Sequence, residues 1–332
     1  MSKYKASIIG CGKIAGSLDN KDSTNSIFSH ASGYDKHKLF EIKSICDRSL
    51  KNLQHFSLKW EVDRCYQDLD EMLNKEKPHV LSICTPNKYH FEHIMIALNS
   101  KWVPKVIFLE KPCCDNKDEF IKISNKLKDS DTAVLVNHTR RFCPGHNQVK
   151  QIIDSGLLGK LLRGSIDYYG DWINNGCHII DTLKMFFNND IEIKDLYRKN
   201  FDDEKKLFLD LNIMLNDAEI SIKVNDERFF QLYESHFIFE KGRVQLLDFG
   251  EKIIIETAKT NNWNENILSE INESPIRGLE SPIYHAVDII SKFLDGNIKL
   301  DKTGALFNQT KHTMNILWNS KNTFVKGEKY DN

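Results

Sequence analysis

The sequence predicts an α/β protein whose N-terminal part forms a parallel sheet, followed by an α+β part with a mainly antiparallel sheet. The 332 residues suggest two domains, at about 150 residues each. Strand-like and helix-like runs alternate through the first 137 residues, which is typical of βαβ units. Between residues 191 and 256, runs of period two follow one another without a helix, which favours antiparallel pairing. We therefore expect domains at 1–137 and 138–332.

Short apolar runs are the expected strands of the parallel sheet: Ala6–Gly10, Glu41–Asp47, His79–Cys84, Lys105–Leu109 and Ala133–Asn137. Runs with apolar residues at helical spacing are the expected helices between them: Arg64–Asn74, Tyr89–Asn99 and Asp115–Lys128. Further helices are expected in the second half of the chain: Asn147–Ser155, Cys177–Phe187, Pro282–Leu294 and Thr303–Asn319.

Composition argues against two classes of partner. Lys and Arg number 46 against 47 Asp and Glu, so no basic excess drives binding to nucleic acid. No run reaches the roughly 18 apolar residues of a membrane span, and the first ten residues lack the apolar core of a signal peptide.

The eight cysteines form no CxxC pair, which predicts free thiols and no metal site. We expect a cytoplasmic protein.

A glycine-rich turn, Gly10-Cys11-Gly12-Lys13-Ile14-Ala15-Gly16, follows the first expected strand. Gly10 permits a tight turn, Gly12 lets the backbone approach a pyrophosphate, and Ala15 is small enough for close helix–strand packing. The helix that should open here would offer unpaired N–H groups to phosphate oxygens. The pattern predicts a dinucleotide-binding site, and an incidental glycine-rich turn is the alternative.

Asp47, at the end of the second expected strand, is a candidate partner for the adenine-ribose hydroxyls. Its charge favours NAD over NADP, whereas Arg48 keeps NADP open because a guanidinium pairs with a 2′-phosphate. Asp47 lies 31 residues beyond Gly16, against about 20 in the usual pattern. We interpret the polar stretch Asp19–Ser29 as an inserted loop that accounts for the excess. A solvated strand end is the alternative.

Two further turns follow expected strands, where parallel strands present their carboxyl ends to a cofactor. In the first, Thr85 and Asn87 can bond ribose or nicotinamide groups, and His90 can cap or line the site; plain turn chemistry is the alternative. In the second, Glu110-Lys111-Pro112, Lys111 would face the nicotinamide end and stabilise a substrate alkoxide as hydride leaves. A solvated surface lysine is its alternative.

The last chemical signal is Asn174-Asn175-Gly176-Cys177-His178-Ile179-Ile180-Asp181. His178 and Asp181 stand three residues apart on an expected helix, so they share a face. A histidine near a helix start and beside a carboxylate suits proton transfer near neutral pH. A structural histidine paired with Asp181 is the alternative.

In this order the motifs resemble those of the Gfo/Idh/MocA family, named for glucose–fructose oxidoreductase, inositol dehydrogenase and a rhizopine-catabolism protein. The residues that carry the resemblance, over about residues 4 to 190, are GCGKIAG, CD at Cys46-Asp47, YQDLDEML at Tyr66–Leu73, CTPNKYH at Cys84–His90, EKP at Glu110–Pro112, RRFCP at Arg140–Pro144 and GCHIID at Gly176–Asp181. The resemblance implies a Rossmann domain, then an α/β substrate domain with a largely antiparallel sheet. It also implies an NAD(P)-dependent oxidoreductase of sugars, sugar nucleotides or cyclitols.

The resemblance implies that Lys111 is the catalytic lysine and His178 the proton acceptor or donor. The cofactor, expected to be NAD with NADP as the alternative, would be held by Gly10, Gly12, Lys13, Ile14, Ala15, Asp47, Arg48, Thr85, Pro86, Asn87, His90, Glu110 and Lys111. The expected substrate contacts are Arg141, Trp172, Asn174, Asn175 and Asp181. For Trp172, stacking on a sugar ring and core packing are both open. A homo-oligomer is expected.

Two departures from the family pattern stand out. Many members have an Asp where this chain has Asn174, so His178 lacks that carboxylate, and Asp181 or Asp171 would have to replace it. The 19–29 insert and the long link Asn99–Leu109 resemble a branch associated with bacterial surface-polysaccharide sugars.

Two other functions stay open beside a dehydrogenase. One is a glycosidase-type enzyme that recycles its NAD through oxidation, elimination and reduction. The other is a non-catalytic regulator that kept the fold and binds NAD or sugar. The joint presence of Lys111 and His178 favours an enzyme over a regulator.

Overall fold

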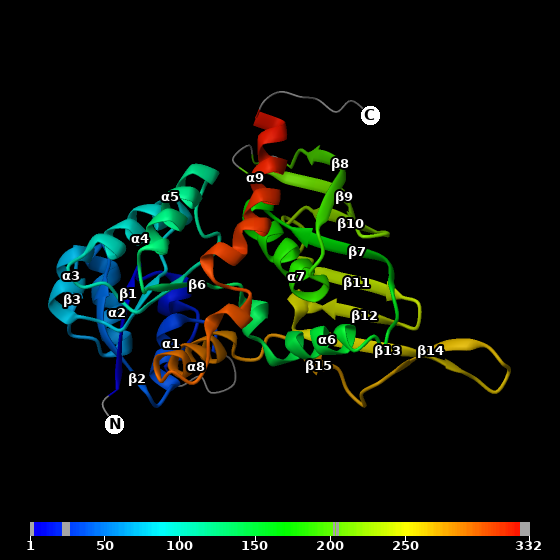
Figure 1. Cartoon of the computed structure of the whole chain (residues 1–332), viewed down its shortest axis with the longest axis horizontal. Helices are drawn as coiled ribbons and strands as arrows, with labels where there is room; N and C mark the ends of the chain where they lie inside the picture. Colours follow the sequence, from blue (N-terminus) through cyan, green and yellow to red (C-terminus); the bar gives the residue numbers. More distant parts are fainter. Residues whose placement is uncertain (1–2, 22–26, 202, 204–205, 326–332) are drawn as a thin grey trace. The chain divides into compact units, whose positions relative to one another are not determined.

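The computed structural model describes residues 3–21, 27–201, 203 and 206–325, and these form two compact units (Figure 1). The first unit takes the described residues up to Phe142 together with Ser281–His312. The second takes Cys143–Glu280 and the described residues from Thr313 onward. The expected domains, 1–137 and 138–332, stay a prediction; by its contacts, the segment 281–312 returns to the first unit.

The first unit is built on a six-stranded sheet with the strand order β3-β2-β1-β4-β5-β6. The sheet is parallel, as the sequence predicts, and it contains one strand, β3, beyond the five expected ones. Its strands are β1 (Tyr4–Ile9), β2 (Phe40–Cys46), β3 (Cys65–Tyr66), β4 (Val80–Ile83), β5 (Val106–Leu109) and β6 (Ala133–Val136). Strands β4 and β5 are buried throughout, since helices cover both faces of a parallel sheet. The apolar runs in the sequence reflect this burial.

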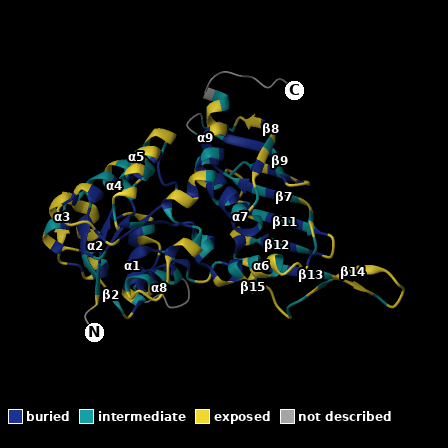
Figure 2. Ribbon diagram, viewed as in Figure 1, coloured by how far each residue is buried: buried dark blue, intermediate teal, exposed yellow. Residues whose placement is uncertain are grey.

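The helices of the first unit are α1 (His30–Lys36), α2 (Leu50–Trp60), α3 (Leu69–Glu76), α4 (His90–Asn99), α5 (Lys117–Lys128) and α8 (Pro282–Leu294). Shorter helical turns are η1 (Lys13–Ser17), η2 (Asn87–Tyr89), η3 (Thr139–Phe142), η6 (Leu300–Thr303) and η7 (Phe307–Thr310). Helices α3, α4 and α5 pack side by side, and Figure 2 shows exposed residues along their outer sides.

Helix α8 completes the core of the first unit. Ala286 and Val287 are fully buried in the same apolar cluster as Ala31 and Tyr34 of α1. Gly33 of α1 lets the two helices approach, because a Cβ there would lie 2.7 Å from the Cγ2 atom of Ile283. This packing is the reason that the segment 281–312 belongs with the parallel sheet.

The structure corrects one predicted helix and adds another that the sequence did not predict. The expected helix Arg64–Asn74 begins later, because Cys65-Tyr66 pair with β2 and the Asp68 carboxylate caps α3 by accepting the Glu71 N–H at 2.7 Å. Helix α2 was not predicted. Its Ser49 cap stands before a helix with three buried apolar residues, whereas Leu50 and Leu58 on its other side are exposed.

The second unit is a nine-stranded sheet with the order β14-β13-β12-β11-β7-β10-β9-β8, and β15 pairs with β13. Its strands are β7 (Leu161–Tyr169), β8 (Ile191–Lys199), β9 (Phe208–Leu215), β10 (Ala218–Asn225), β11 (Glu234–Phe239), β12 (Gly242–Leu247), β13 (Lys252–Thr260), β14 (Asn266–Glu270) and β15 (Ile276–Arg277). Only the β7–β10 pair is parallel among these strands. The expected mainly antiparallel sheet is confirmed.

The helical segments of this part of the chain are α6 (Pro144–Asp154), η4 (Trp172–Gly176), α7 (Cys177–Phe187), η5 (Asp248–Gly250) and α9 (Lys311–Val325). Helix α7 has the predicted bounds, and Phe186 and Phe187 at its end pack on Phe237 of the sheet. The expected helix Thr303–Asn319 is wrong in its first half, where η6 and η7 precede α9.

The eight cysteines all lie within the described residues, and none of them forms a disulfide bond. Within the described ranges, no three His, Cys, Asp or Glu side chains gather as a metal site would require. None of the described helices combines the length and the apolar character of a membrane span.

We predict that Gly16→Ala destabilises the first unit by about 1–3 kcal/mol, because the added methyl overpacks a filled site. Its Cβ would lie 2.6 Å from the Cε2 atom of Phe56 and closer still to the Trp60 indole nitrogen. Urea unfolding followed by tryptophan fluorescence measures the loss. Gly12→Ala is the matched control, since a Cβ at Gly12 meets no heavy atom within 4 Å; equal midpoints for the two variants would contradict the prediction.

Candidate active site

The glycine-rich turn lies against the end of the neighbouring strand β4. Gly10 has a φ of +89°, and a Cβ there would lie 2.8 Å from the Cys84 carbonyl carbon and the Thr85 amide nitrogen. Only glycine fits both the conformation and the close approach. At Gly12, by contrast, a Cβ would enter open space. The backbone there is accessible, as a pyrophosphate cradle requires.

The expected helix after this turn is much shorter than predicted. Lys13–Ser17 form a five-residue π-helical turn, and α1 begins only at His30. Ala15 is fully buried, but the closest packing is made by Gly16 against Phe56 and Trp60 of α2. Part of the expected insert Asp19–Ser29, residues 22–26, lies outside the described residues.

Asp47 lies beside the glycine-rich turn. Its Oδ2 atom accepts the Cys11 N–H at 2.8 Å, and its Oδ1 atom accepts the Ser49 N–H at 2.8 Å. The Asn52 side-chain amide donates to the same carboxylate at 3.3 Å. The carboxylate therefore joins the turn after β1 to the turn after β2, in spite of the 31 residues that separate it from Gly16.

A pocket of about 530 Å³ opens where β1, β2 and β4 end. Six of the predicted cofactor residues line it: Gly10, Gly12, Asp47, Arg48, Thr85 and Pro86. The sequence reasoning missed the other lining residues: Ile9, Cys46, Asn52, Gln67, Asp68, Leu69, Cys84, Tyr89, Glu92, His93 and Ile96. A glycine turn, an acidic strand end and a pocket between them fit the adenosine half of a dinucleotide.

Arg48 and Tyr89 form one wall of this pocket. The Arg48 guanidinium donates to the Tyr89 hydroxyl at 2.9 Å, and its Cζ atom lies 5.0 Å from the ring centroid. Hydrogen bonds from Arg48 and Lys88 lower the pKa of Tyr89. A planar cation on an aromatic ring offers a stacking surface of the kind that a purine base takes. Tyr89 belongs to the motif CTPNKYH together with Thr85, so this motif could have indicated that Tyr89 also lines the pocket.

Other predicted residues serve neighbouring turns. The Thr85 hydroxyl bonds the His93 ring at 3.0 Å, and the Asn87 side-chain amide donates to Asp115 at 2.8 Å. His90, predicted to cap or line the site, is almost fully buried instead. Its ring nitrogens lie 2.8 Å from the Pro112 and Thr85 carbonyl oxygens. Burial lowers its pKa, although these two bonds oppose the shift. His90 therefore ties two turns together and does not line the pocket.

Glu110, at the end of β5, is held by a buried cluster. Its Oε1 atom accepts from the His30 Nε2 atom at 2.9 Å and from the Asn137 side-chain amide at 2.6 Å. Burial raises the pKa of Glu110, whereas the hydrogen bonds from His30 and Asn137 and the charge of Lys111 lower it, and the net shift is downward. Glu110 is thus an anion beside half-buried Lys111. The link from Lys111 to Pro112 is a cis peptide bond.

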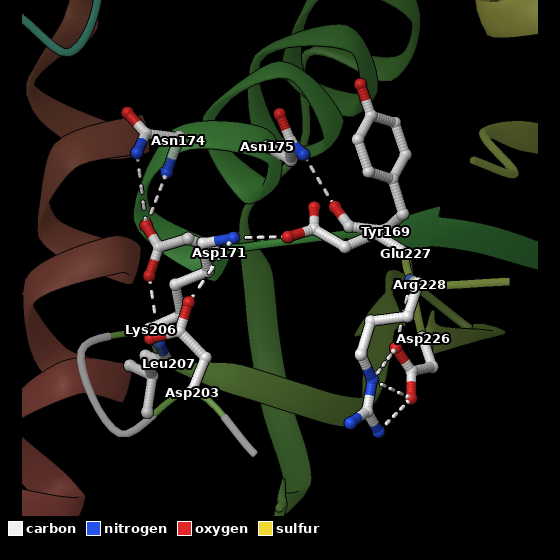
Figure 3. A network of polar contacts seen from close by, with 10 residues as sticks. All are labelled: Tyr169, Asp171, Asn174, Asn175, Asp203, Lys206, Leu207, Asp226, Glu227 and Arg228. Carbon is white, nitrogen blue, oxygen red and sulfur yellow. Dashed lines mark hydrogen bonds and ion pairs between the residues drawn. The ribbon is translucent and has the colours of Figure 1, made fainter. Parts of the chain in front are cut away.

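Figure 3 shows two further predicted residues, Asn174 and Asn175, on the turn of the second unit between β7 and α7. The Asp171 carboxylate accepts the Asn174 N–H at 3.1 Å and the Leu207 N–H at 2.9 Å. The Asn175 side-chain amide donates to the Tyr169 carbonyl at 2.5 Å. Asp171 therefore caps this turn, and Asn174 stays exposed at its surface.

The other predicted side chains of the second unit, on this turn and on α7, differ in how far they are buried. His178 is half-buried at the start of α7, whereas Asp181 is buried. Trp172 is fully buried, and its indole N–H donates to the Ser320 hydroxyl at 2.8 Å. This burial favours core packing, of the two roles that were open for Trp172, over stacking on a sugar.

Arg141 lies in the first unit, half-buried, with its guanidinium against Gly304. Lys111 also belongs to the first unit, and His178, Asn174 and Asn175 belong to the second. The joint action of Lys111 and His178 therefore stays a prediction.

His30 is the most consequential residue that the sequence reasoning missed. It follows the insert, outside every motif that was singled out, and the structure brings it to Glu110. The available signal was the pair His30 and Tyr34, which stand four residues apart and share one face of a helix.

The parallel sheet, the glycine-rich turn and the acidic end of β2 define the class of an NAD-binding Rossmann protein. Residues 4–138 match the Gfo/Idh/MocA family, described as an oxidoreductase family with an NAD-binding Rossmann fold. Over these residues the chain is similar to the NAD-binding Rossmann domain of that oxidoreductase family.

Two curated relatives match the chain over 160 residues. D-Glucoside 3-dehydrogenase of Escherichia coli K12 is 25% identical, over 48% of this chain and 42% of its own length. Inositol 2-dehydrogenase of Salmonella typhimurium LT2 is 28% identical, over 48% of this chain and 44% of its own. The chain thus spans less than half the length of these relatives.

Solved structures match the whole fold. The WlbA dehydrogenase of Bordetella pertussis, in complex with NADH and UDP-GlcNAcA, gives a TM-score of 0.75 at 15% identity and covers 98% of this chain and 97% of its own. KijD10, a 3-ketoreductase of Actinomadura kijaniata in complex with NADP, gives a TM-score of 0.73 at 13% identity, and the match covers 93% of this chain and 95% of its own. At these identities the likeness shows the fold alone.

We predict that Asp47→Ala weakens NADH binding about ten- to hundredfold, the size of one or two lost hydrogen bonds to a charged group. The variant also loses its discrimination against NADPH, because the charge that repels a 2′-phosphate is gone. Titration of NADH and NADPH fluorescence measures both effects. Asp63→Ala, an exposed carboxylate outside the pocket lining, is the control; equal affinities for the two variants would remove Asp47 from the cofactor site.

Proposed function

We propose that this protein is an NAD-dependent oxidoreductase that transfers a hydride between a CH–OH or ketone carbon of a sugar or nucleotide sugar and the nicotinamide. The single observation that carries the proposal is the pocket at the ends of β1, β2 and β4, beside which Glu110 and Lys111 end strand β5. The names of the relatives support the substrate class, since D-glucosides and inositol are both polyhydroxylated rings.

The chain's own residues divide the work in this proposal. Gly10, Gly12 and Asp47 hold the cofactor, which supplies the hydride acceptor at C4 of its nicotinamide when bound. Lys111 binds the substrate hydroxyl and stabilises the alkoxide, and Lys111 or His178 takes the hydroxyl proton. In the reductive direction the same groups return the proton to the carbonyl oxygen.

Asn174 changes the surroundings that we propose for His178. The family position that often holds a carboxylate carries an amide here, and the two oxygens of Asp171 accept backbone N–H groups of Asn174 and Leu207. Asp181 is the remaining acidic residue of this helix turn. We propose that Asn174 and Asn175 contact substrate hydroxyls, together with Arg141.

The test is a panel of sugars and UDP-sugars added to the purified protein with NAD, while absorbance in the NADH band is recorded. Steady NADH accumulation supports a dehydrogenase. Product formation with total NAD unchanged would identify the recycling glycosidase instead. Sugar or NAD binding without turnover on any member of the panel would contradict an enzymatic role.

We predict that Lys111→Ala lowers kcat by about 10²- to 10⁴-fold, the usual contribution of a positioned acid–base group. NADH affinity should stay within about threefold, because the pocket lining is intact. Lys117→Ala, an exposed lysine of α5, is the control with normal turnover expected. Normal turnover by Lys111→Ala would refute the catalytic assignment.

A further inference from the structure

A buried chain of hydrogen bonds crosses the first unit to Glu110. The Tyr34 hydroxyl lies 2.8 Å from the Ser82 hydroxyl, which lies 2.8 Å from the Nδ1 atom of His30. The Nε2 atom of His30 lies 2.9 Å from the Oε1 atom of Glu110. Tyr34, Ser82 and His30 have no exposed surface, and they come from α1 and β4.

Hydrogen-bond satisfaction gives this chain a direction. If Nε2 of His30 carries the hydrogen, it donates to Glu110, and Nδ1 accepts the hydroxyl hydrogen of Ser82. The Ser82 oxygen then accepts the hydroxyl hydrogen of Tyr34, and every buried donor has an acceptor. The three bonds therefore all point from Tyr34 toward the carboxylate.

The opposite arrangement leaves a donor without an acceptor. With a doubly protonated His30, three hydrogens, on Nδ1, on the Ser82 hydroxyl and on the Tyr34 hydroxyl, have only two hydrogen bonds to share. Neither hydroxyl has a further partner in the described part of the chain, so one buried hydroxyl hydrogen is left without an acceptor. Burial also raises the pKa of Tyr34, so the phenol keeps its hydrogen. A buried unmet donor and a second buried charge both cost stability.

The cluster holds only one side of the Glu110 carboxylate. His30 and Asn137 both donate to Oε1, whereas Oε2 accepts no hydrogen bond within the described residues. The side chain keeps 11% of its surface exposed, and that of His30 keeps none. The Phe108 ring, 4.4 Å from the His30 ring, closes the other side of the imidazole. The buried contacts therefore fix the orientation of the carboxylate and leave one oxygen on the outer side.

We infer that His30 is a positioning residue: as a neutral imidazole with its hydrogen on Nε2, it holds the Glu110 carboxylate through the one-way chain from Tyr34 and Ser82. Lys111 follows Glu110 directly in the sequence, so the cluster also fixes the backbone from which the lysine side chain starts. The kinetic consequence rests on the proposed function; the protonation pattern of His30 does not.

The first experiment reads His30 directly, without turnover. Full-length protein labelled with ¹⁵N-histidine is measured near neutral pH by long-range ¹H–¹⁵N correlation, and the His30 signals are assigned by their loss in His30→Gln. We expect a neutral ring with the hydrogen on Nε2. A ring with its hydrogen on Nδ1, or with both nitrogens protonated, overturns the inference.

The second experiment separates positioning from general stability. We expect His30→Ala to lower kcat by at least about tenfold while NADH affinity stays within about threefold. His30→Gln, whose amide keeps an N–H donor, should recover part of the loss. Ser82→Ala should give a smaller loss of kcat, because it removes only the group that orients the ring.

Ser7→Ala is the matched control for Ser82→Ala. Ser7 is equally buried in the same sheet and loses an equivalent hydroxyl bond, to Ser44 at 2.7 Å. Among the described residues, this serine pair makes no hydrogen bond to His30 or Glu110. We expect normal kcat for this variant. Equal kcat values for Ser82→Ala and Ser7→Ala overturn the positioning role, even where His30→Ala fails to fold. A wild-type protein without turnover refutes the proposed function, and the ¹⁵N result then decides the assignment of His30.

Discussion

The close approach of the glycine-rich turn to the strand on either side is the constraint on which the candidate site depends. Gly10 touches the end of β4, and the Cys11 N–H is bound by Asp47 at the end of β2. Three parallel strands are thereby fixed at one edge, with their polar turns in one pocket. A parallel sheet makes such an edge available, but these two contacts determine its shape.

Charge is distributed around this edge in two distinct ways. Asp47 meets backbone N–H groups at the pocket, where a partly exposed carboxylate can still accept from a ligand. Glu110 is held from the buried side by His30 and Asn137, so its negative charge has a fixed place next to Lys111. The Asp47 carboxylate is therefore suited to recognise a ligand, and the Glu110 carboxylate is suited to orient the neighbouring Lys111 ammonium.

The sequence predicted the parts of the fold in which local pattern and burial agree. Helix α7 and helix α8 have their predicted bounds, since apolar spacing and end signals coincide there. The start of α1 was missed because a polar stretch separates it from the glycine turn, and Trp172 stayed ambiguous because an aromatic side chain suits a core as well as a sugar. Residues such as His30 act through partners distant in sequence, at Ser82 and Glu110, which no local pattern reveals.

The return of residues 281–312 to the first unit has a consequence for synthesis of the chain. The apolar cluster around Tyr34 lacks Ile283, Ala286, Val287 and Ile290 until the ribosome has made α8, about 140 residues after η3. During synthesis the parallel sheet of the first unit therefore lacks one of its covering helices, α8, until the whole antiparallel sheet has been translated. The order in which the two units mature need not follow the order in which they are encoded.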